Sequence, residues 1–311
     1  MMDCIFLGGS SVDTIVEVPR MPETDEKLLA NFAGVQGGGL VANAACAAAR
    51  LGLVTGWAGV IGDDAGGELV LRDMQQHGVD TRWADILPGM ASDFCIILLD
   101  PSRERTILVC NTTPNIPDLR PELLEALSAA RMVYLIPQPA AYFAQLLAAV
   151  QSGGGKIAVD MEAARALPRE DVEFCLRRSQ VVFCNAAALR AFSGEEDTAA
   201  GARVLLEMGV EVVAVTMGSR GAAAFRAGEE AFSPSFAVPV ADTTGAGDCF
   251  HGAFLAGLFE GWPLEQILIF SNAAAALSVQ KIGARGCLPT LAEVRAFLAA
   301  REIEMPGLIQ D

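Results

Sequence analysis

Basic residues are scarce in this chain of 311 residues, in which 22 lysines and arginines face 38 aspartates and glutamates. The formal net charge of −16 argues against a nucleic-acid-binding protein, because a phosphate backbone is neutralised by a basic surface. An acidic protein can still bind a nucleotide through backbone N–H groups, a helix N-terminus and a divalent ion. We therefore expect small-molecule ligands and no nucleic-acid partner.

Long apolar runs are also missing, although 52% of the residues are hydrophobic. Charged residues interrupt the alanine-rich stretches well before the roughly 18 apolar residues that a membrane-spanning helix needs. The first residues have neither the basic start nor the apolar core of a secretory signal. The eight cysteines form no Cys-x-x-Cys pair, and several lie inside apolar runs, which favours buried thiols over disulfides or metal ligands. These features predict a cytoplasmic globular protein without a membrane partner.

Two glycine-rich segments lack the residues of common nucleotide motifs. The sequence Gly-Gly-Gly-Lys at 153–156 has no Ser or Thr after the lysine, as a Walker-type phosphate loop requires. The sequence Gly-Gly-Ser-Ser at 8–11 lacks the spacing of a dinucleotide fingerprint, which leaves a dehydrogenase as a distant alternative.

The pattern of apolar residues predicts an α/β fold. Short runs rich in β-branched residues alternate with longer alanine- and leucine-rich runs of helical period, as in a parallel sheet whose strands are joined by helices. The stretches of about 14–34 and 82–110 read instead as strands linked by turns. We predict one three-layer α/β/α domain over 1–311, with a small β lid formed mainly by these two stretches and with parts of the second in the main sheet. The clearest main-sheet strands are the first residues, 132–136, 156–160, 180–184 and 210–216.

The strongest chemical signal is Asp-Thr-Thr-Gly-Ala-Gly-Asp at 242–248, followed by a helical run to about Gly261. Small residues ahead of a helix let backbone N–H groups converge on an anion at the positive end of the helix dipole. Asp248 falls in the first turn, where it can accept a proton from an attacking hydroxyl. Taken alone, the motif is more typical of an acidic residue that only stabilises its helix N-terminus, and the further motifs below reverse that preference.

Two further glycine-containing segments point to ligands. The segment 36–43 opens a helix that runs through Arg50, and Asn43 offers both a donor and an acceptor to a sugar hydroxyl; close helix packing is the alternative. The segment 216–221 directly follows a predicted strand. It can hold nucleotide phosphates through its backbone and Arg220, or form a tight strand-to-strand turn, which is commoner.

In order along the chain, Gly-Gly-x-x-x-Asn at 38–43, Gly-x-x-Gly-x-Asp-x-x-Gly at 59–67 and the motif at 242–248 resemble the ribokinase family of carbohydrate kinases, also called the phosphofructokinase-B family. The resemblance runs from the first strand to about Pro289. It implies a ribokinase-like fold, an ATP-dependent sugar kinase that uses Mg²⁺, and K⁺ as a further cofactor, because many members bind a monovalent cation.

The resemblance also implies a role for each matching residue. Asp248 becomes the catalytic base, with Gly245, Ala246 and Gly247 as the anion hole. Asp13, Gly38, Gly39 and Asn43 match the sugar site, while Thr216, Gly218, Gly221, Thr244 and Asn272 match the nucleotide site. Asp242 and Thr244, with a loop at about 279–287, match the monovalent-cation site.

The chain departs from the family at the metal and at the sugar. Many relatives carry Asn-x-x-Glu where this chain has Asn-Ala-Ala-Ala at 185–188, so magnesium falls to Asp160 or Glu162, unless these only cap a helix or end a strand. Leu40 replaces the Lys of ribokinases and the Asn of ketohexokinases, which weakens any transfer of ribose or fructose specificity. Gln138 and Arg105 are further candidates for binding the substrate. Arg105 would bind an anionic group of the substrate; the alternative is that it is an ordinary solvated arginine.

We predict transfer of the ATP γ-phosphoryl group to a hydroxyl, most simply a primary one, of a small sugar or sugar derivative. A nucleoside kinase of the same fold is the first alternative. A catalytically weak sensor of a sugar or nucleotide is the second, because the acid of Asn-x-x-Glu is missing. His251, three positions after Asp248, either supports it or only packs. Exposed lid strands can pair across a homodimer.

Overall fold

A computed structural model describes residues 2–102, 105–114, 116–162 and 167–305. Its centre is an eight-stranded sheet in which neighbouring strands pair in parallel, except for two antiparallel pairs at one edge that involve the last two strands along the chain. Strands appear at each of the main-sheet positions predicted from the sequence. The order across the sheet is β14 (Glu229–Ser233), β13 (Ala222–Arg226), β12 (Val212–Thr216), β11 (Val181–Asn185), β10 (Lys156–Asp160), β9 (Met132–Leu135), β1 (Cys4–Leu7) and β4 (Thr55–Ala58).

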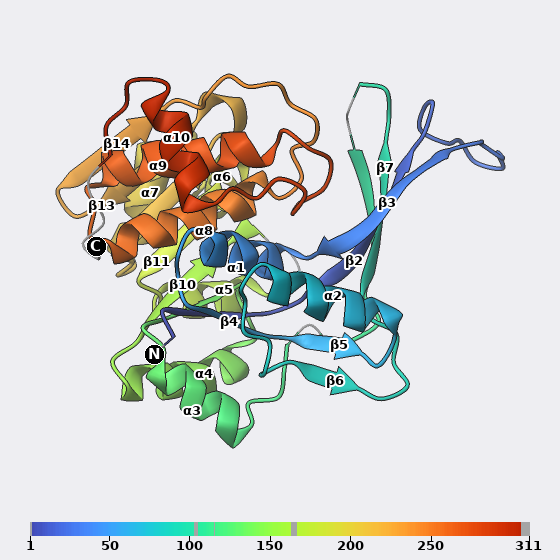
Figure 1. Cartoon of the computed structure of the whole chain (residues 1–311). Helices are drawn as coiled ribbons and strands as arrows, with labels where there is room; N and C mark the ends of the chain where they lie inside the picture. The colour runs from blue at the N-terminus through green and yellow to red at the C-terminus, as the bar shows by residue number, and fades with distance from the viewer. Residues whose placement is uncertain (1, 103–104, 115, 163–166, 306–311) are drawn as a thin grey trace.

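Helices cover both faces of this sheet (Figure 1), so the predicted three-layer α/β/α architecture is confirmed. Neighbouring strand residues alternate between two buried apolar cores: Phe6 belongs to one and Ile5 to the other. The first core is covered by α1 (Leu40–Arg50), α2 (Ala65–Gln76), α8 (Ala246–Phe259), α9 (Leu264–Ser278) and α10 (Leu291–Ala299), and the second by α3 (Pro121–Ala129), α4 (Ala140–Ser152), α5 (Arg169–Leu176), α6 (Ala186–Ser193) and α7 (Thr198–Glu207).

A second sheet projects beside the main body (Figure 1). It has the order β3 (Asn31–Gly38), β2 (Ser11–Glu17), β7 (Phe94–Leu99) and β8 (Arg105–Cys110), and a further pair joins β5 (Val60–Gly62) to β6 (Asp85–Leu87). The expectation that parts of 82–110 belong to the main sheet is therefore wrong. Strand β7 alternates buried and more exposed residues, as a sheet with one solvated face requires, whereas the central strands are buried on both faces.

The buried face of the second sheet has its own small apolar cluster. Ile15, Cys95, Ile97 and Leu99 form it, and Ile282 of the loop after α9 packs against it. This sheet therefore contacts the loop that also borders the 242–248 motif.

Helices α1 and α8 approach each other closely at Gly252. A Cβ atom at residue 252 would lie 2.7 Å from the Ala48 nitrogen and 2.9 Å from the Ala44 oxygen, so only glycine fits. The alanine-rich sequence of α1 serves the same contact, because small side chains let two helix backbones meet. As a result, Asn43 near the start of α1 lies beside Asp248 at the start of α8.

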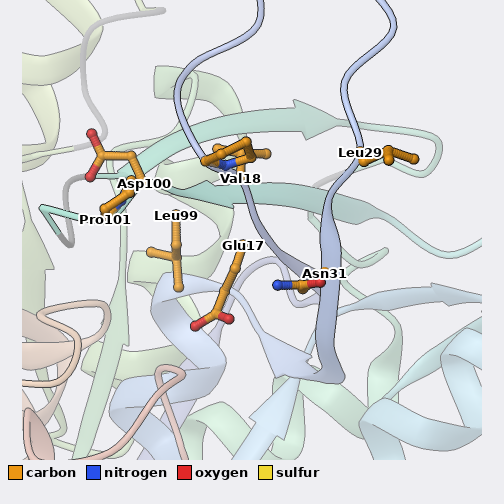
Figure 2. A pocket seen from close by; sticks show the side chains of 8 residues that line it. Glu17, Val18, Leu29, Asn31, Leu99, Asp100 and Pro101 are labelled. Atoms are coloured by element: carbon orange, nitrogen blue, oxygen red, sulfur yellow. The ribbon is translucent and has the colours of Figure 1, made fainter.

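A hollow of about 380 Å³ lies at the far end of the second sheet, where Glu17, Leu29 and Asp100 are among the residues that line it (Figure 2). None of its lining residues was predicted to bind sugar, nucleotide or metal. Within the described residues, no helix has the length and apolar character needed to cross a membrane.

Candidate active site

The base predicted from the sequence lies in the first turn of α8, as expected. Gly245 caps this helix in the left-handed conformation, with a φ of 76°, and a Cβ there would come within 2.9 Å of Ala284. Glycine is needed on both counts, because it adopts positive φ without strain and lets the loop after α9 lie against the helix start. The residues 245–247 form the start of this helix directly before Asp248, and their role as an anion hole stays a prediction.

Asp248 is only partly exposed, and its carboxyl group is held by a neighbouring helix. Asn43, which is buried, donates a hydrogen bond from Nδ2 to Asp248 Oδ2 over 2.8 Å. The pKa of Asp248 is raised to about 7, mainly by removal of the carboxyl from water; the Asn43 hydrogen bond opposes this, the charges of Asp160 and Glu162 add to it, and Arg285 opposes it. A pKa near neutrality suits a general base.

The predicted sugar residues at 13, 38, 39 and 43 come together at one end of β2 and β3. Asp13 is buried and accepts a hydrogen bond of 2.7 Å from the Ser11 hydroxyl. Gly38 lies so close that a Cβ there would be 2.1 Å from Asp13 Oδ2, and Gly39 begins α1 directly afterwards. The pKa of Asp13 is raised by burial, against the effects of Ser11 and Arg285. Gly38 thus lies against the buried Asp13 carboxyl group, whereas the Asn43 side chain contacts Asp248 and Arg285.

Asp242 ties the 242–248 motif to the loop after α9. One carboxylate oxygen accepts from the Thr244 nitrogen at 2.9 Å and from its hydroxyl at 2.6 Å, and the other accepts from the Gly283 nitrogen at 2.9 Å. The two segments predicted to share a monovalent cation are therefore adjacent.

The two further substrate candidates have protein partners. Gln138 is buried just after β9, and its Nε2 donates to the Ile136 oxygen at 3.3 Å. Arg105, at the start of β8, donates from its guanidinium to the Thr243 hydroxyl. This bond joins the second sheet to the 242–248 motif.

The predicted nucleotide residues lie on three elements. Thr216 ends β12, and the segment 217–221, with the short 3-10 helix η2 (Gly218–Arg220), turns the chain into antiparallel β13. The strand-to-strand turn weighed above therefore describes the backbone of 216–221, and Arg220 is exposed there. Asn272 on α9 donates from Nδ2 to the Ser233 oxygen at 2.9 Å and to the Pro234 oxygen at 3.2 Å, which holds the segment after β14.

The two candidate magnesium ligands differ in accessibility. Asp160 is fully buried; it accepts from the Glu162 nitrogen at 2.9 Å and from the Tyr134 hydroxyl at 3.3 Å. Asp160 has no exposed surface through which a hydrated cation could reach it, whereas Glu162 is exposed and fits a hard cation or its water shell. In the described ranges, no three His, Cys, Asp or Glu side chains are grouped to hold a metal ion. Asn185 caps α6 by accepting from the Ala188 nitrogen.

His251 lies one turn beyond Asp248 and is buried. Its Nδ1 is 3.0 Å from the Tyr134 hydroxyl, and its ring centroid is 4.4 Å from that of Phe183. Burial lowers the pKa of His251 to about 3. The ring is therefore neutral at physiological pH, which favours the packing interpretation.

One residue of the site was missed. Arg285 is buried in the loop after α9, where Nε donates to Asn43 Oδ1 at 2.9 Å and Nη2 donates to the Gly38 oxygen at 2.8 Å. The third nitrogen, Nη1, pairs with Asp73 of α2. The available signal was a single arginine between small residues, Gly-Ala-Arg-Gly, just after a long apolar helix.

Residues 2–291 match the pfkB family of carbohydrate kinases. Ribokinase of Haemophilus influenzae is 28% identical over 300 residues, which cover 94% of this chain and 97% of that protein. ATP-dependent ribose-1-phosphate kinase of Halopiger xanaduensis is 30% identical over 303 residues, covering 97% and 99%. The structure of Arabidopsis thaliana ribokinase complexed with ribose and ATP matches with a TM-score of 0.84 and 27% identity, covering 96% and 99%.

The fold and the family match together define a sugar phosphotransferase. The chain belongs to the pfkB family of carbohydrate kinases. The predictions of the ribokinase family, of its fold and of an ATP-dependent sugar kinase are thereby confirmed. The acceptor and the roles of individual residues stay predictions.

Proposed function

We propose that this kinase transfers the γ-phosphoryl group of Mg-ATP to a hydroxyl group, most simply a primary one, of a small sugar or sugar derivative, with Asp248 as general base. The observation that carries the proposal is the position of Asp248 at the glycine-rich start of α8, with its pKa raised to about 7 and its carboxylate held by Asn43. The carboxylate accepts the proton of the acceptor hydroxyl while that oxygen attacks phosphorus.

The residues around the base are proposed to bind the transferred phosphoryl group, the metal ions and the nucleotide. Backbone N–H groups at 245–248, at the positive end of α8, stabilise negative charge on the phosphoryl group while it is transferred. Magnesium bound with ATP would neutralise phosphate charge, and the exposed carboxylate of Glu162 is the accessible protein group for it. The turn at 216–221 and Asn272 would hold the nucleotide, and Asp242, Thr244 and the loop after α9 would supply oxygen ligands for K⁺.

Asp13, Gly38 and Gly39 form the acceptor end of the site, to which Arg105 and Gln138 are proposed to contribute. Relatives named ribokinase, ribose-1-phosphate kinase and deoxyribokinase support pentoses and their derivatives as the first acceptors to test. Leu40 stands where ribokinases have lysine, so the panel must extend beyond ribose.

The deciding experiment is an ATP-consumption screen with ribose, 2-deoxyribose, ribose 1-phosphate, fructose and adenosine, run with wild type and Asp248→Asn side by side. We expect a sugar product with the wild type and a loss of turnover of about 10²-fold or more in the variant. Phosphorylation of adenosine alone would favour the nucleoside kinase. Tight sugar binding without ATP consumption would favour the sensor.

We also propose that two copies associate through the second sheet, in the cytoplasm. By the strand registers, Val35, Thr14, Ile96 and Leu108 form a row on the face turned away from Ile15 and Ile97. Three of the four are apolar, and Val35 and Leu108 are 43% and 50% exposed. Exposed apolar side chains in a row are a typical protein-binding surface, and a second copy offers the same surface by symmetry.

A further inference from the structure

Arg285 is an unusual residue in this chain, because it is a buried cation in a strongly acidic protein. Only 6% of its surface is exposed, and each of its three guanidinium nitrogens has its own partner on a different segment. Nε contacts Asn43 of α1, Nη1 contacts Asp73 of α2, and Nη2 contacts the Gly38 oxygen at the end of β3. A lysine has no such fork and cannot serve three acceptors in these directions.

The contact with Asn43 determines which way its amide points. A guanidinium has only donors, so the atom of Asn43 that faces it must be the oxygen. The amide nitrogen then faces the other way, toward Asp248, and donates to Oδ2. With the amide reversed, an oxygen would face the Asp248 carboxylate and a nitrogen would face the guanidinium, and both contacts would be repulsive.

We propose that Arg285 is a positioning residue for phosphoryl transfer, which fixes the Asn43 amide so that it holds the Asp248 carboxylate in the direction of the acceptor hydroxyl. This inference rests on the proposed function, in which Asp248 is the base. The same guanidinium holds the Gly38 carbonyl, so the turn predicted to bind the sugar and the base are oriented by one side chain.

The loop that carries Arg285 is anchored on the phosphate side as well. The Gly283 nitrogen donates to Asp242, and Ala284 lies against Gly245 at the start of α8. Residues 283–285 thus contact the 242–248 motif with their backbone and the 36–43 turn with one side chain. The backbone contacts of this loop with the 242–248 motif do not involve the Arg285 side chain. Loss of the guanidinium fork should therefore change the geometry of phosphoryl transfer more than the binding of ATP.

A double-mutant cycle tests this directly. Arg285→Met, Asn43→Ala and the double variant are assayed with the acceptor that wild type uses best. We expect Arg285→Met to lower kcat about tenfold or more with the KM for ATP within about twofold of wild type. In the Asn43→Ala background the same change should lower kcat less than about twofold, because the amide through which Arg285 orients Asp248 is already gone. The remaining contact with the Gly38 oxygen should affect the KM for the acceptor instead. Equal losses in both backgrounds would overturn the proposal.

The chain provides a matched control in Arg50. Its Nε donates to the Leu288 oxygen over 2.6 Å, so it ties down the same loop without contacting Asn43. Arg50→Met should keep kcat within about threefold of wild type even where its thermal midpoint falls as much as that of Arg285→Met. If both variants lose turnover in proportion to stability, Arg285 is merely structural and the proposal fails.

A conservative variant covers the case in which Arg285→Met does not fold. Arg285→Lys retains the positive charge beside Asp73, and we expect its kcat to be about tenfold lower than that of wild type. Wild-type turnover in this variant would contradict the need for the guanidinium fork.

Asp248→Asn separates the present inference from the proposed function. If it is as active as wild type, the assigned base is wrong and the positioning role falls with it. If it is inactive while the Arg285 variants are normal, only the present inference fails.

Discussion

The carboxyl group of Asp248 is largely withdrawn from water, which raises its pKa and should lower the stability of the folded protein where the group is charged. A carboxyl group whose folded pKa is raised, here to about 7, favours folding below its unfolded pKa and loses that contribution as pH rises through 7. We expect Asp248→Asn to raise the unfolding free energy at pH 8 by about 1–2 kcal/mol, allowing for the partial exposure of the group.

Urea denaturation of both proteins at pH 8 and pH 5 measures this effect. The advantage of the variant should shrink at pH 5, where Asp248 of the folded wild type is protonated. A variant less stable than wild type at pH 8 would mean that the charged carboxylate is stabilised by its neighbours after all.

The same pKa predicts how activity depends on pH. Because the base must be deprotonated, kcat/KM should fall about tenfold per unit below pH 7 and level off above it. Asn43→Ala removes a hydrogen bond that lowers the pKa of Asp248, so its acidic limb should lie at higher pH. Rates at pH 5.5–8.5 with saturating ATP provide the measurement, and a flat wild-type profile would remove Asp248 as the titrating base.

Single residues differ in how far the sequence reveals them. The positions of Asp248, Asn43 and Gly38 at the ends of elements were predictable from their motifs, whereas their proposed roles came from the order of those motifs and the family resemblance it carries. Arg285 was not, because its partner Asn43 is 242 positions away and the contact exists only once α1 and the loop after α9 meet. The small residues around it, in Gly-Ala-Arg-Gly, do not by themselves distinguish it from a solvated loop arginine.

At the scale of elements, the start of α8 depends on Gly245. Alanine at this position must adopt positive φ and would collide with Ala284, so we expect Gly245→Ala to lower the unfolding free energy by about 2 kcal/mol and to reduce turnover strongly. Gly247→Ala is the matched control: nothing lies within 4 Å of its added Cβ, and alanine is the better helix former, so stability should hold or rise by about 0.5–1 kcal/mol. Thermal unfolding of both variants tests this, and equal midpoints would contradict it.

A strand could be predicted from the sequence where its own pattern of apolar residues identifies it. Strands β9 to β12 are continuous apolar runs buried on both faces, which a sequence displays directly. Strand β7 also shows its alternation, but the sheet it joins depends on pairing with β2, some 80 residues earlier. The segment 216–221 shows the same limit, since its turn follows from antiparallel pairing of β12 with β13.

At the scale of the molecule, one face of the second sheet contacts the main body and the other face is exposed. Its inner face contacts Ile282 and, through Arg105, the hydroxyl of Thr243, so the sheet is linked directly to the 242–248 motif and to the loop after α9. Its outer face leaves Val35 and Leu108 exposed. A partner on the outer face would therefore restrict the sheet and favour the arrangement in which Arg105 reaches the 242–248 motif.

Dimerisation through this face can be tested by introducing one charged side chain. We expect wild type to sediment as a dimer at tens of micromolar, and Leu108→Asp to weaken dimerisation at least a hundredfold, because a carboxylate would be buried without a partner. Phe232→Asp is the control: Phe232 is 58% exposed, but it lies on the edge strand β14 of the main sheet, so the dimer should persist. Dimers of unchanged strength in Leu108→Asp would place the interface elsewhere. If turnover falls with dimerisation at Leu108 and not at Phe232, the second copy acts by holding the sheet against the 242–248 motif.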